Sequence, residues 1–187
     1  MHIYVALLRG INIGPHKQIK MDQLRALCTE LGWDAPQTYI QTGNVVFEHP
    51  STPPERLAAD LRAAIQGQLG FDAPVLVRSV EEYRAEVAAN PFAERHTSEP
   101  KALHIAFLGA LPAPERIAGL PELPDPREAY AIIARAVYLY CPAGYGRSNI
   151  PHAFWERHLK VPATVRNWNT ALALRDLATA RATPPDA

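Results

Sequence analysis

Apolar and polar positions alternate along the first 80 residues in a pattern that predicts a small α+β domain. Residues 2–9 are apolar on both faces, which predicts a central strand covered on both sides. Apolar positions spaced three or four apart predict helices at residues 21–31 and 54–69, and each pattern ends at a glycine. Residues 38–47 predict a hairpin, and residues 74–78 predict a last strand. The order β-α-β-β-α-β is the split βαβ arrangement of a ferredoxin-like domain.

Two capping-box sequences mark predicted helix starts. Thr52 and Glu55 stand three apart before the second helix, and Ser79 and Glu82 stand three apart before a third. The third helix is expected to end before Pro91, because proline cannot continue a helix.

The rest of the chain also mixes strands and helices. A break is expected at Pro162, and the pattern after residue 144 is otherwise mostly helical. The other predicted elements are a strand at 102–108, a short helix at 113–119 and a hairpin at 129–134 and 136–141.

We therefore expect an α+β protein of two domains. A ferredoxin-like domain would take residues 1–79, and a second, smaller α+β domain ending in helices would take residues 80–182. Residues 183–187 are expected to form a disordered tail. The two halves are similar in make-up, which suggests an internal duplication.

The hairpin sequence TYIQTGNVVF at 38–47 contains Gly43-Asn44, which predicts a two-residue type II′ turn. That turn would pair Thr42 with Val45 and would place Tyr39 and Gln41 together on the face that the helices do not cover. The turn explains why Gly43 and Asn44 occur here, whereas it assigns no structural role to Tyr39 and Gln41.

The ferredoxin-like order also predicts where this turn lies relative to the first loop. We expect the first strand to end at the sheet edge opposite the turn, so that Asn44 lies about one strand length, roughly 15 Å, from Asn12. Tyr39 would lie nearer to Arg9.

Composition excludes several classes of protein. The 187 residues are 48% hydrophobic and 20% charged, and 19 basic residues balance 19 acidic ones, so strong non-specific attraction to nucleic acid or membrane is not expected. The start, MHIYVALLRG, lacks the pattern of a secretion signal, and no apolar run is long enough to span a bilayer. We expect a cytoplasmic protein whose two cysteines, Cys28 and Cys141, are free.

The loop after the first strand has two glycines and basic neighbours. Backbone amides of such a loop cradle anions in other proteins, and Arg9, Lys17 and Lys20 would add charge. The spacing of Gly10 and Gly14 fits neither a P-loop nor a dinucleotide fingerprint. The alternative is a loop that needs φ > 0 at two positions.

Two later motifs are also rich in polar side chains. In GYGRS at 144–148, Ser148 is a candidate helix N-cap, and a helix start favours anions. In RNWNT at 166–170, Arg166 is a candidate bidentate ligand for a phosphate or carboxylate, or a partner of an internal acidic residue. Asn167 and Asn169 are candidate caps, and Trp168 is expected to pack in the core or an interface.

Four stretches together resemble the bacterial family catalogued as domain of unknown function 1697. They are YVALLRGINIG at 4–14, TYIQTGNVVF at 38–47, GYGRS at 144–148 and RNWNT at 166–170. The resemblance implies a cytoplasmic bacterial protein of two α+β domains with a ferredoxin-like part, and it implies no molecular function. Pro15 stands where the family has a second glycine, which weakens the case for a glycine-rich phosphate cradle.

Arginine, amide, tyrosine and hydroxyl side chains without carboxylates favour an anionic or amide-rich ligand over a metal. The leading hypothesis is a protein that binds a nucleotide, a phosphorylated metabolite or nucleic acid in a cleft between the two domains. The alternatives are a metal-independent enzyme acting on such a ligand and a protein-interaction module without a small-molecule site. No catalytic residue, metal ligand or cofactor is assigned, no membrane partner is expected, and the oligomeric state stays open. The candidate ligand-binding residues are Arg9, Asn12, Lys20, Tyr39, Gln41, Asn44, Tyr145, Arg147, Ser148, Arg166, Asn167 and Asn169.

Overall fold

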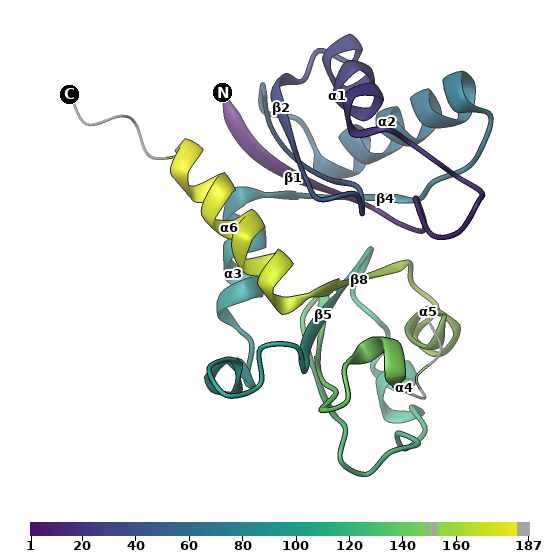
Figure 1. Cartoon of the computed structure of the whole chain (residues 1–187), viewed down its shortest axis with the longest axis vertical. Coiled ribbons are helices and arrows are strands. Elements are labelled where there is room, and N and C mark those ends of the chain that lie inside the picture. Colours follow the sequence, from purple (N-terminus) through teal and green to yellow (C-terminus); the bar gives the residue numbers. More distant parts are fainter. Residues whose placement is uncertain (149, 151–152, 183–187) are drawn as a thin grey trace. The chain divides into compact units, whose positions relative to one another are not determined.

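The computed structural model describes residues 1–148, 150 and 153–182, and it shows an α+β protein, as the sequence predicted. The chain divides into two compact units, and the first consists of Met1–Ala85 together with the chain from Ala173 on. The second unit is Glu86–Leu172, and each unit contains one four-stranded antiparallel sheet (Figure 1). The domain limits expected from the sequence, 1–79 and 80–182, stay a prediction, and the expected tail at 183–187 lies outside the described residues.

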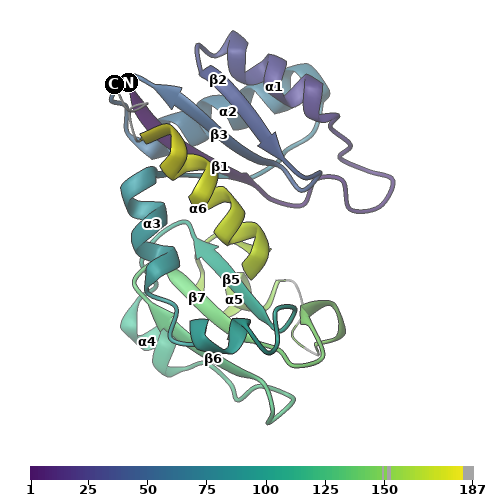
Figure 2. The same ribbon diagram turned by 60° about the vertical axis from the view of Figure 1, so that its left-hand side comes forward.

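The first unit has the predicted order β-α-β-β-α-β. Its strands lie in the order β2-β3-β1-β4, and helices α1 and α2 cover one face of the sheet (Figures 1 and 2). Its ferredoxin-like classification stays a prediction. The elements are β1 (His2–Leu8), α1 (Met21–Glu30), β2 (Asp34–Tyr39), β3 (Asn44–His49), α2 (Pro54–Leu69), β4 (Val75–Ser79) and α3 (Val80–Ala88), which continues into the second unit.

Strand β1 is buried on both faces, as its uninterrupted apolar sequence predicted. Tyr4, Ala6 and Leu8 pack into the core beneath α1 and α2, where Phe47 stacks on Trp33 with ring centroids 3.7 Å apart. Burial of such aromatic pairs is a large favourable contribution to folding.

The predicted helix ends are confirmed, but only one of the two capping boxes is. Ser79 Oγ accepts the N–H of Glu82 at 3.2 Å, and the Glu82 carboxylate accepts the N–H of Ser79 at 3.0 Å. The box expected at Thr52 and Glu55 is wrong, because the N-cap of α2 is Pro53 and no side chain caps that helix within the described residues. The hydroxyl of Thr52 lies instead 3.1 Å from Nδ1 of a neighbouring histidine, His49.

The predicted register of the β2–β3 hairpin is also wrong. Tyr39 pairs with Asn44, so the loop has four residues, 40–43, instead of two. The side chain of Asn44 stabilises this longer loop, because its Nδ2 donates to the carbonyl of Tyr39 (3.0 Å) and to Oγ1 of Thr42 (2.9 Å). Ile40 and Gly43 both adopt a left-handed conformation, with φ of 49° and 76°, to close the longer loop.

The second unit repeats the strand order of the first, as β6-β7-β5-β8. Residues 163–167 were expected to be helical and form a strand instead, because the β-branched Thr164 and Val165 pair with β5. The elements of this unit are η1 (Ala93–His96), β5 (Leu103–Leu108), α4 (Pro114–Ala118), β6 (Ala129–Ile133), β7 (Ala136–Tyr140), η2 (Tyr145–Arg147), α5 (Phe154–Leu159), β8 (Ala163–Asn167) and α6 (Trp168–Ala182), which ends in the first unit.

Both sheets carry a buried arginine at the corresponding position of their last strand. Arg78 pairs with Val5 across β1 and β4, and Arg166 pairs with Ile105 across β5 and β8. Each guanidinium donates to the carbonyl of the residue before it, at 3.3 Å for Arg78 and 3.0 Å for Arg166. The shared strand order and the matching arginines support an internal duplication.

Gly43 is required both by its backbone conformation and by its surroundings. A Cβ at this position would lie 2.7 Å from Cβ of Leu8 and from Cδ1 of Ile11. We expect Gly43→Ala to lower the free energy of unfolding, measured with urea, by about 2–4 kcal/mol, because steric overlap adds to left-handed strain. Gly14→Ala is the matched control, since φ is 74° there and no atom lies within 4 Å, so strain alone should cost about 1 kcal/mol. Equal losses in the two variants would contradict the close packing at Gly43.

Candidate functional site

The loop after β1 and the β2–β3 turn meet at one edge of the first sheet. Nδ2 of Asn12 donates to the carbonyls of Ile19 (3.0 Å) and Gln41 (2.8 Å), and Oδ1 of Asn12 accepts the N–H of Ile19 (2.9 Å). The expected separation of about one strand length is therefore wrong. The reason is topological: β1 runs antiparallel to β3, so the end of β1 lies beside the start of β3.

A cavity of about 680 Å³ opens where these two loops meet α1. It brings together three of the residues predicted from the sequence, Asn12, Lys20 and Gln41. Its full lining is Asn12, Gln18, Ile19, Lys20, Asp22, Gln23 and Gln41. We call this cavity the α1 cavity.

The polar groups of the α1 cavity are one ammonium, one carboxylate and several carboxamides. The carboxylate of Asp22 forms an ion pair with Arg25, and Lys20 is the other charged residue of the lining. Lys20 also occupies the N-cap of α1, where no side chain accepts a hydrogen bond from the first turn, within the described residues. A cation at the positive end of a helix is unfavourable, and the acidic residue in the first turn of α1, Asp22, is the one that pairs with Arg25.

The two loops that border the α1 cavity contain strained backbone. Asn12, Lys17 and Ile40 all have positive φ, at 54°, 55° and 49°. Such conformations cost on the order of 1–3 kcal/mol for a residue other than glycine, and surrounding contacts must hold them. Nζ of Lys17 donates to the carbonyl of Asp72 at 2.8 Å, and the hydrogen bonds of Asn12 hold the rest of the loop.

Sequence reasoning missed Gln18 and Gln23. Gln23 lies one helical turn after Lys20, on the same end of α1, and this i, i+3 spacing is the signal that could have identified it. Gln18 precedes the helix and donates through Nε2 to the carbonyl of Gly14.

The other candidates of the first unit lie outside the α1 cavity lining. Asn44 is fully buried, and its amide closes the hairpin. Tyr39 is half-buried at the end of β2, and its carbonyl accepts the Asn44 amide. Arg9 follows β1, and its backbone N–H donates to the carbonyl of Pro74 at 2.9 Å.

In the second unit, GYGRS does not open the helix that was expected. Tyr145–Arg147 is a 3₁₀ turn, and α5 begins only at Phe154, so the prediction of Ser148 as its N-cap is wrong. Ser148 Oγ instead accepts the N–H of Ile150 at 3.0 Å. Arg147 is exposed, whereas Tyr145 is buried, and burial raises the pKa of Tyr145 to about 12.

RNWNT spans the end of β8 and the start of α6. Arg166 is only 7% exposed, and its Nη1 donates to Oγ1 of Thr164 at 2.8 Å. Oδ1 of Asn167 accepts the N–H of Asn169 (3.0 Å), so Asn167 caps α6 as expected, and Oδ1 of Asn169 lies 2.6 Å from Nε2 of His96. Arg166 and Asn167 therefore have structural roles, one as a hydrogen-bond donor inside the sheet and the other as a helix cap.

His104 links the two motifs, and sequence reasoning missed it. Its ring lies 5.4 Å from the ring of Tyr145, and its Nε2 lies 3.5 Å from Nδ2 of Asn167. Burial lowers the pKa of His104, against a smaller raising effect of the carbonyl of Ala102. A single histidine in the apolar strand sequence ALHIAFL was the available signal.

The comparisons with known proteins agree with this fold. A sequence profile of the family described as "Protein of unknown function (DUF1697)" matches residues 1–138, which include the loop after β1 and the β2–β3 hairpin. The chain belongs to this family. The match ends before GYGRS and RNWNT, and the family predicted from the four motifs is confirmed.

A solved structure is similar to this DUF1697 protein over nearly its whole length. It is "The structure of conserved bacterial protein SP0830 from Streptococcus pneumoniae", with a TM-score of 0.74 and 21% identical residues. The likeness covers 95% of this chain and 98% of that chain, and at this identity it shows a shared fold alone. A comparison with curated proteins gave no match.

Neither a metal centre nor a reactive thiol stands out in the described part of this DUF1697 protein. No three His, Cys, Asp or Glu side chains there are placed to hold a metal ion, and no helix there is long and apolar enough to cross a bilayer. Cys28 and Cys141 are free and buried, and burial raises the pKa of each to about 12, so both stay protonated at neutral pH.

The Asn12 contacts predict a large effect on stability. We expect Asn12→Ala to lower the free energy of unfolding, measured with urea, by about 1–3 kcal/mol, because the hydrogen bonds to Ile19 and Gln41 are lost. Gln23→Ala, at an exposed position of the same cavity, should change it by less than about 0.5 kcal/mol. Similar values for the two variants would show that Asn12 does not hold the loops together.

His104 predicts a pH dependence of stability in the acidic range. The pKa of His104 is lowered in the folded state, so between its folded value and the unfolded value of about 6.5 the unfolded chain binds a proton that the folded chain does not. Its contribution is complete above about pH 6.5 and is lost as pH falls through that window. In urea unfolding at pH 7.5 and 5.5, His104→Gln should show a smaller loss of stability than the parent protein. An equal loss would contradict a buried, neutral His104.

Proposed function

We propose that this DUF1697 protein binds a small anionic ligand, a phosphorylated metabolite or a nucleotide, in the α1 cavity. The observation that carries the proposal is the lining itself, which presents one ammonium and several carboxamides while Arg25 neutralises its one carboxylate. A phosphate group would be complementary to this set, because lysine and amide N–H groups donate and phosphate oxygens accept.

The position of Lys20 gives the anion a further role. Bound between the ammonium of Lys20 and the first turn of α1, it would accept hydrogen bonds that no side chain within the described residues accepts. It would also relieve the unfavourable placement of a cation at the positive end of the helix dipole. The hydrogen-bond donors of the first turn and the local electrostatics thus both favour a negatively charged ligand.

The carboxamides would orient the rest of the ligand. Gln23 and Gln41 are exposed, and each amide offers both a donor and an acceptor to hydroxyl or amide groups. Asn12 would act indirectly, because its amide already holds the loop that carries Gln41. Of the predicted ligand-binding residues, Lys20 and Gln41 are therefore those we place in contact with the ligand.

A small ligand fits this cavity better than nucleic acid does. The chain has no net charge, and the cavity has a single unneutralised lysine, whereas nucleic-acid binding rests on several phosphate contacts. We further propose that the protein acts in the cytoplasm, since its two thiols are free and no disulfide joins them. A ligand between the two α+β parts, as expected from the sequence, stays a prediction.

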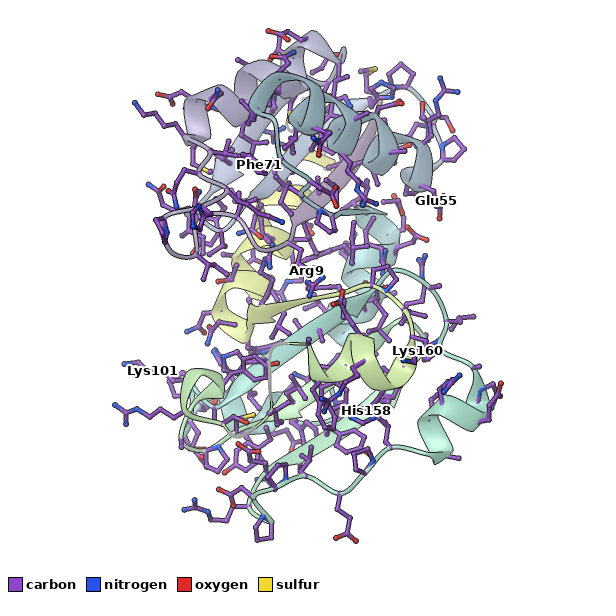
Figure 3. The ribbon with its side chains drawn as sticks, turned by 90° about the vertical axis from the view of Figure 1, so that its right-hand side faces the viewer. Arg9, Glu55, Phe71, Lys101, His158 and Lys160 are labelled. Atoms are coloured by element: carbon purple, nitrogen blue, oxygen red, sulfur yellow. The ribbon has the colours of Figure 1, made fainter. Side chains whose placement is uncertain are left out.

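Charge substitutions in the α1 cavity test the proposal in both directions. We expect Lys20→Gln to weaken binding of AMP and ribose 5-phosphate about tenfold, the loss of one charge-assisted hydrogen bond. Asp22→Asn should tighten binding about two- to fivefold, since the positive charge of Arg25 is then no longer compensated by its ion pair with Asp22. Lys101→Gln, an exposed lysine of the second unit, is the matched control and should leave affinity unchanged (Figure 3). Isothermal titration calorimetry gives the affinities.

The outcomes separate the alternatives. Binding that is equal in the parent, Lys20→Gln and Asp22→Asn proteins would place the anion elsewhere and overturn the proposed site. The absence of binding by phosphate compounds at millimolar concentration would favour the protein-interaction hypothesis.

A further inference from the structure

Two isoleucines with exposed side chains stand in the two loops that border the α1 cavity. Ile13 is 72% exposed and Ile40 is 47% exposed, and each is the chain neighbour of a lining residue, Asn12 or Gln41. The amide of Asn12 joins the two loops through its 2.8 Å hydrogen bond to the carbonyl of Gln41. Each exposed apolar side chain therefore belongs to one of the two loops that border the cavity.

Folding does not account for isoleucine at position 40. Its φ of 49° is a left-handed conformation, which a β-branched residue adopts only with strain. Burial of the Ile40 side chain does not offset this strain, because nearly half of the side chain is exposed. Asparagine or glycine would close the same turn at a lower cost.

The second unit has a small residue at the start of its own hairpin loop. In the β6–β7 hairpin, whose loop has two residues instead of four, the first loop residue is Ala134, and it has the same left-handed φ of 49° as Ile40. Residues strained without a folding benefit are found at functional sites, where contact with a ligand explains their retention.

We propose that the ligand of the α1 cavity is amphiphilic, an alkyl or acyl ester of a phosphate whose hydrocarbon part lies against Ile13 and Ile40. This inference rests on the function proposed above and adds the chemical class of the ligand. The anionic group binds at Lys20, and the apolar part leaves the cavity between the two loops. Contact with the hydrocarbon removes both isoleucine side chains from water, which gives the exposed positions a favourable role.

A series of alkyl phosphates tests the class of ligand. Methyl, butyl and hexyl phosphate are used below their micellar concentrations, and calorimetry measures each affinity. Full burial of a methylene contributes about 0.8 kcal/mol, which is about fourfold in affinity. For a hydrocarbon covered on one side we expect about twofold for each methylene, so that hexyl phosphate binds at least tenfold more tightly than methyl phosphate.

Substitutions of the two isoleucines place the hydrocarbon. Ile13→Ser and Ile40→Asn should remove the dependence on chain length and leave the affinity for methyl phosphate unchanged. Leu111→Ser is the matched control, since Leu111 is 68% exposed in the second unit and should have no effect. Ile40→Asn should in addition raise the Tm by about 2–4 °C, because asparagine relieves the left-handed strain.

Each outcome decides the proposal. Equal affinities for methyl and hexyl phosphate would overturn the amphiphilic ligand and leave the anion site standing, whereas the absence of binding by either would overturn both. A chain-length dependence that persists in Ile13→Ser and Ile40→Asn, or a lower Tm of Ile40→Asn, would overturn the role of the isoleucines. Binding to phosphatidic acid vesicles without binding to monomeric hexyl phosphate would show that a membrane surface, and not a soluble ester, is recognised.

Discussion

The carboxamide of Asn12 is the contact on which the candidate site depends. It joins three pieces of backbone, the loop after β1, the segment that leads into α1 and the β2–β3 turn, through bonds to Ile19 and Gln41. Because a single planar amide makes all of these bonds, the position of Gln41 is coupled to the start of α1. The α1 cavity is the space that this arrangement leaves between the two loops and the helix.

The candidate ligand-binding residues predicted from the sequence divide into two groups with different roles. Asn44, Arg166 and Asn167 satisfy backbone or side-chain partners inside the protein, and a buried polar group without such partners would be costly. Lys20 and Gln41 stay exposed at the mouth of a cavity. Burial and hydrogen-bond partners, rather than residue type, separate a structural amide from one that is available to a ligand.

The two units share some structural features and differ in others. Strand order, the buried arginine of the last strand and a left-handed residue in the central hairpin occur in both. The segments after the first strand differ, since α1 has ten residues and α4 has five. The segment after β1 therefore differs from the corresponding segment of the second unit, and loops on a rigid sheet commonly carry binding residues.

Local patterns in the sequence determined most of the elements. The apolar run of β1, the helical stripes that end at Gly32 and Gly70 and the capping box at Ser79 are set by residues within one turn of each other, so they could be predicted without tertiary structure. The tertiary structure decided the hairpin register, the strand at 163–167 and the meeting of Asn12 with Gln41. The contact between Asn12 and Gln41 joins residues that are 29 positions apart in the chain. The hairpin register and the strand at 163–167 depend on pairing with neighbouring strands. A sequence does not state which distant backbone groups a side-chain amide will meet, because the strand order of the sheet fixes that proximity.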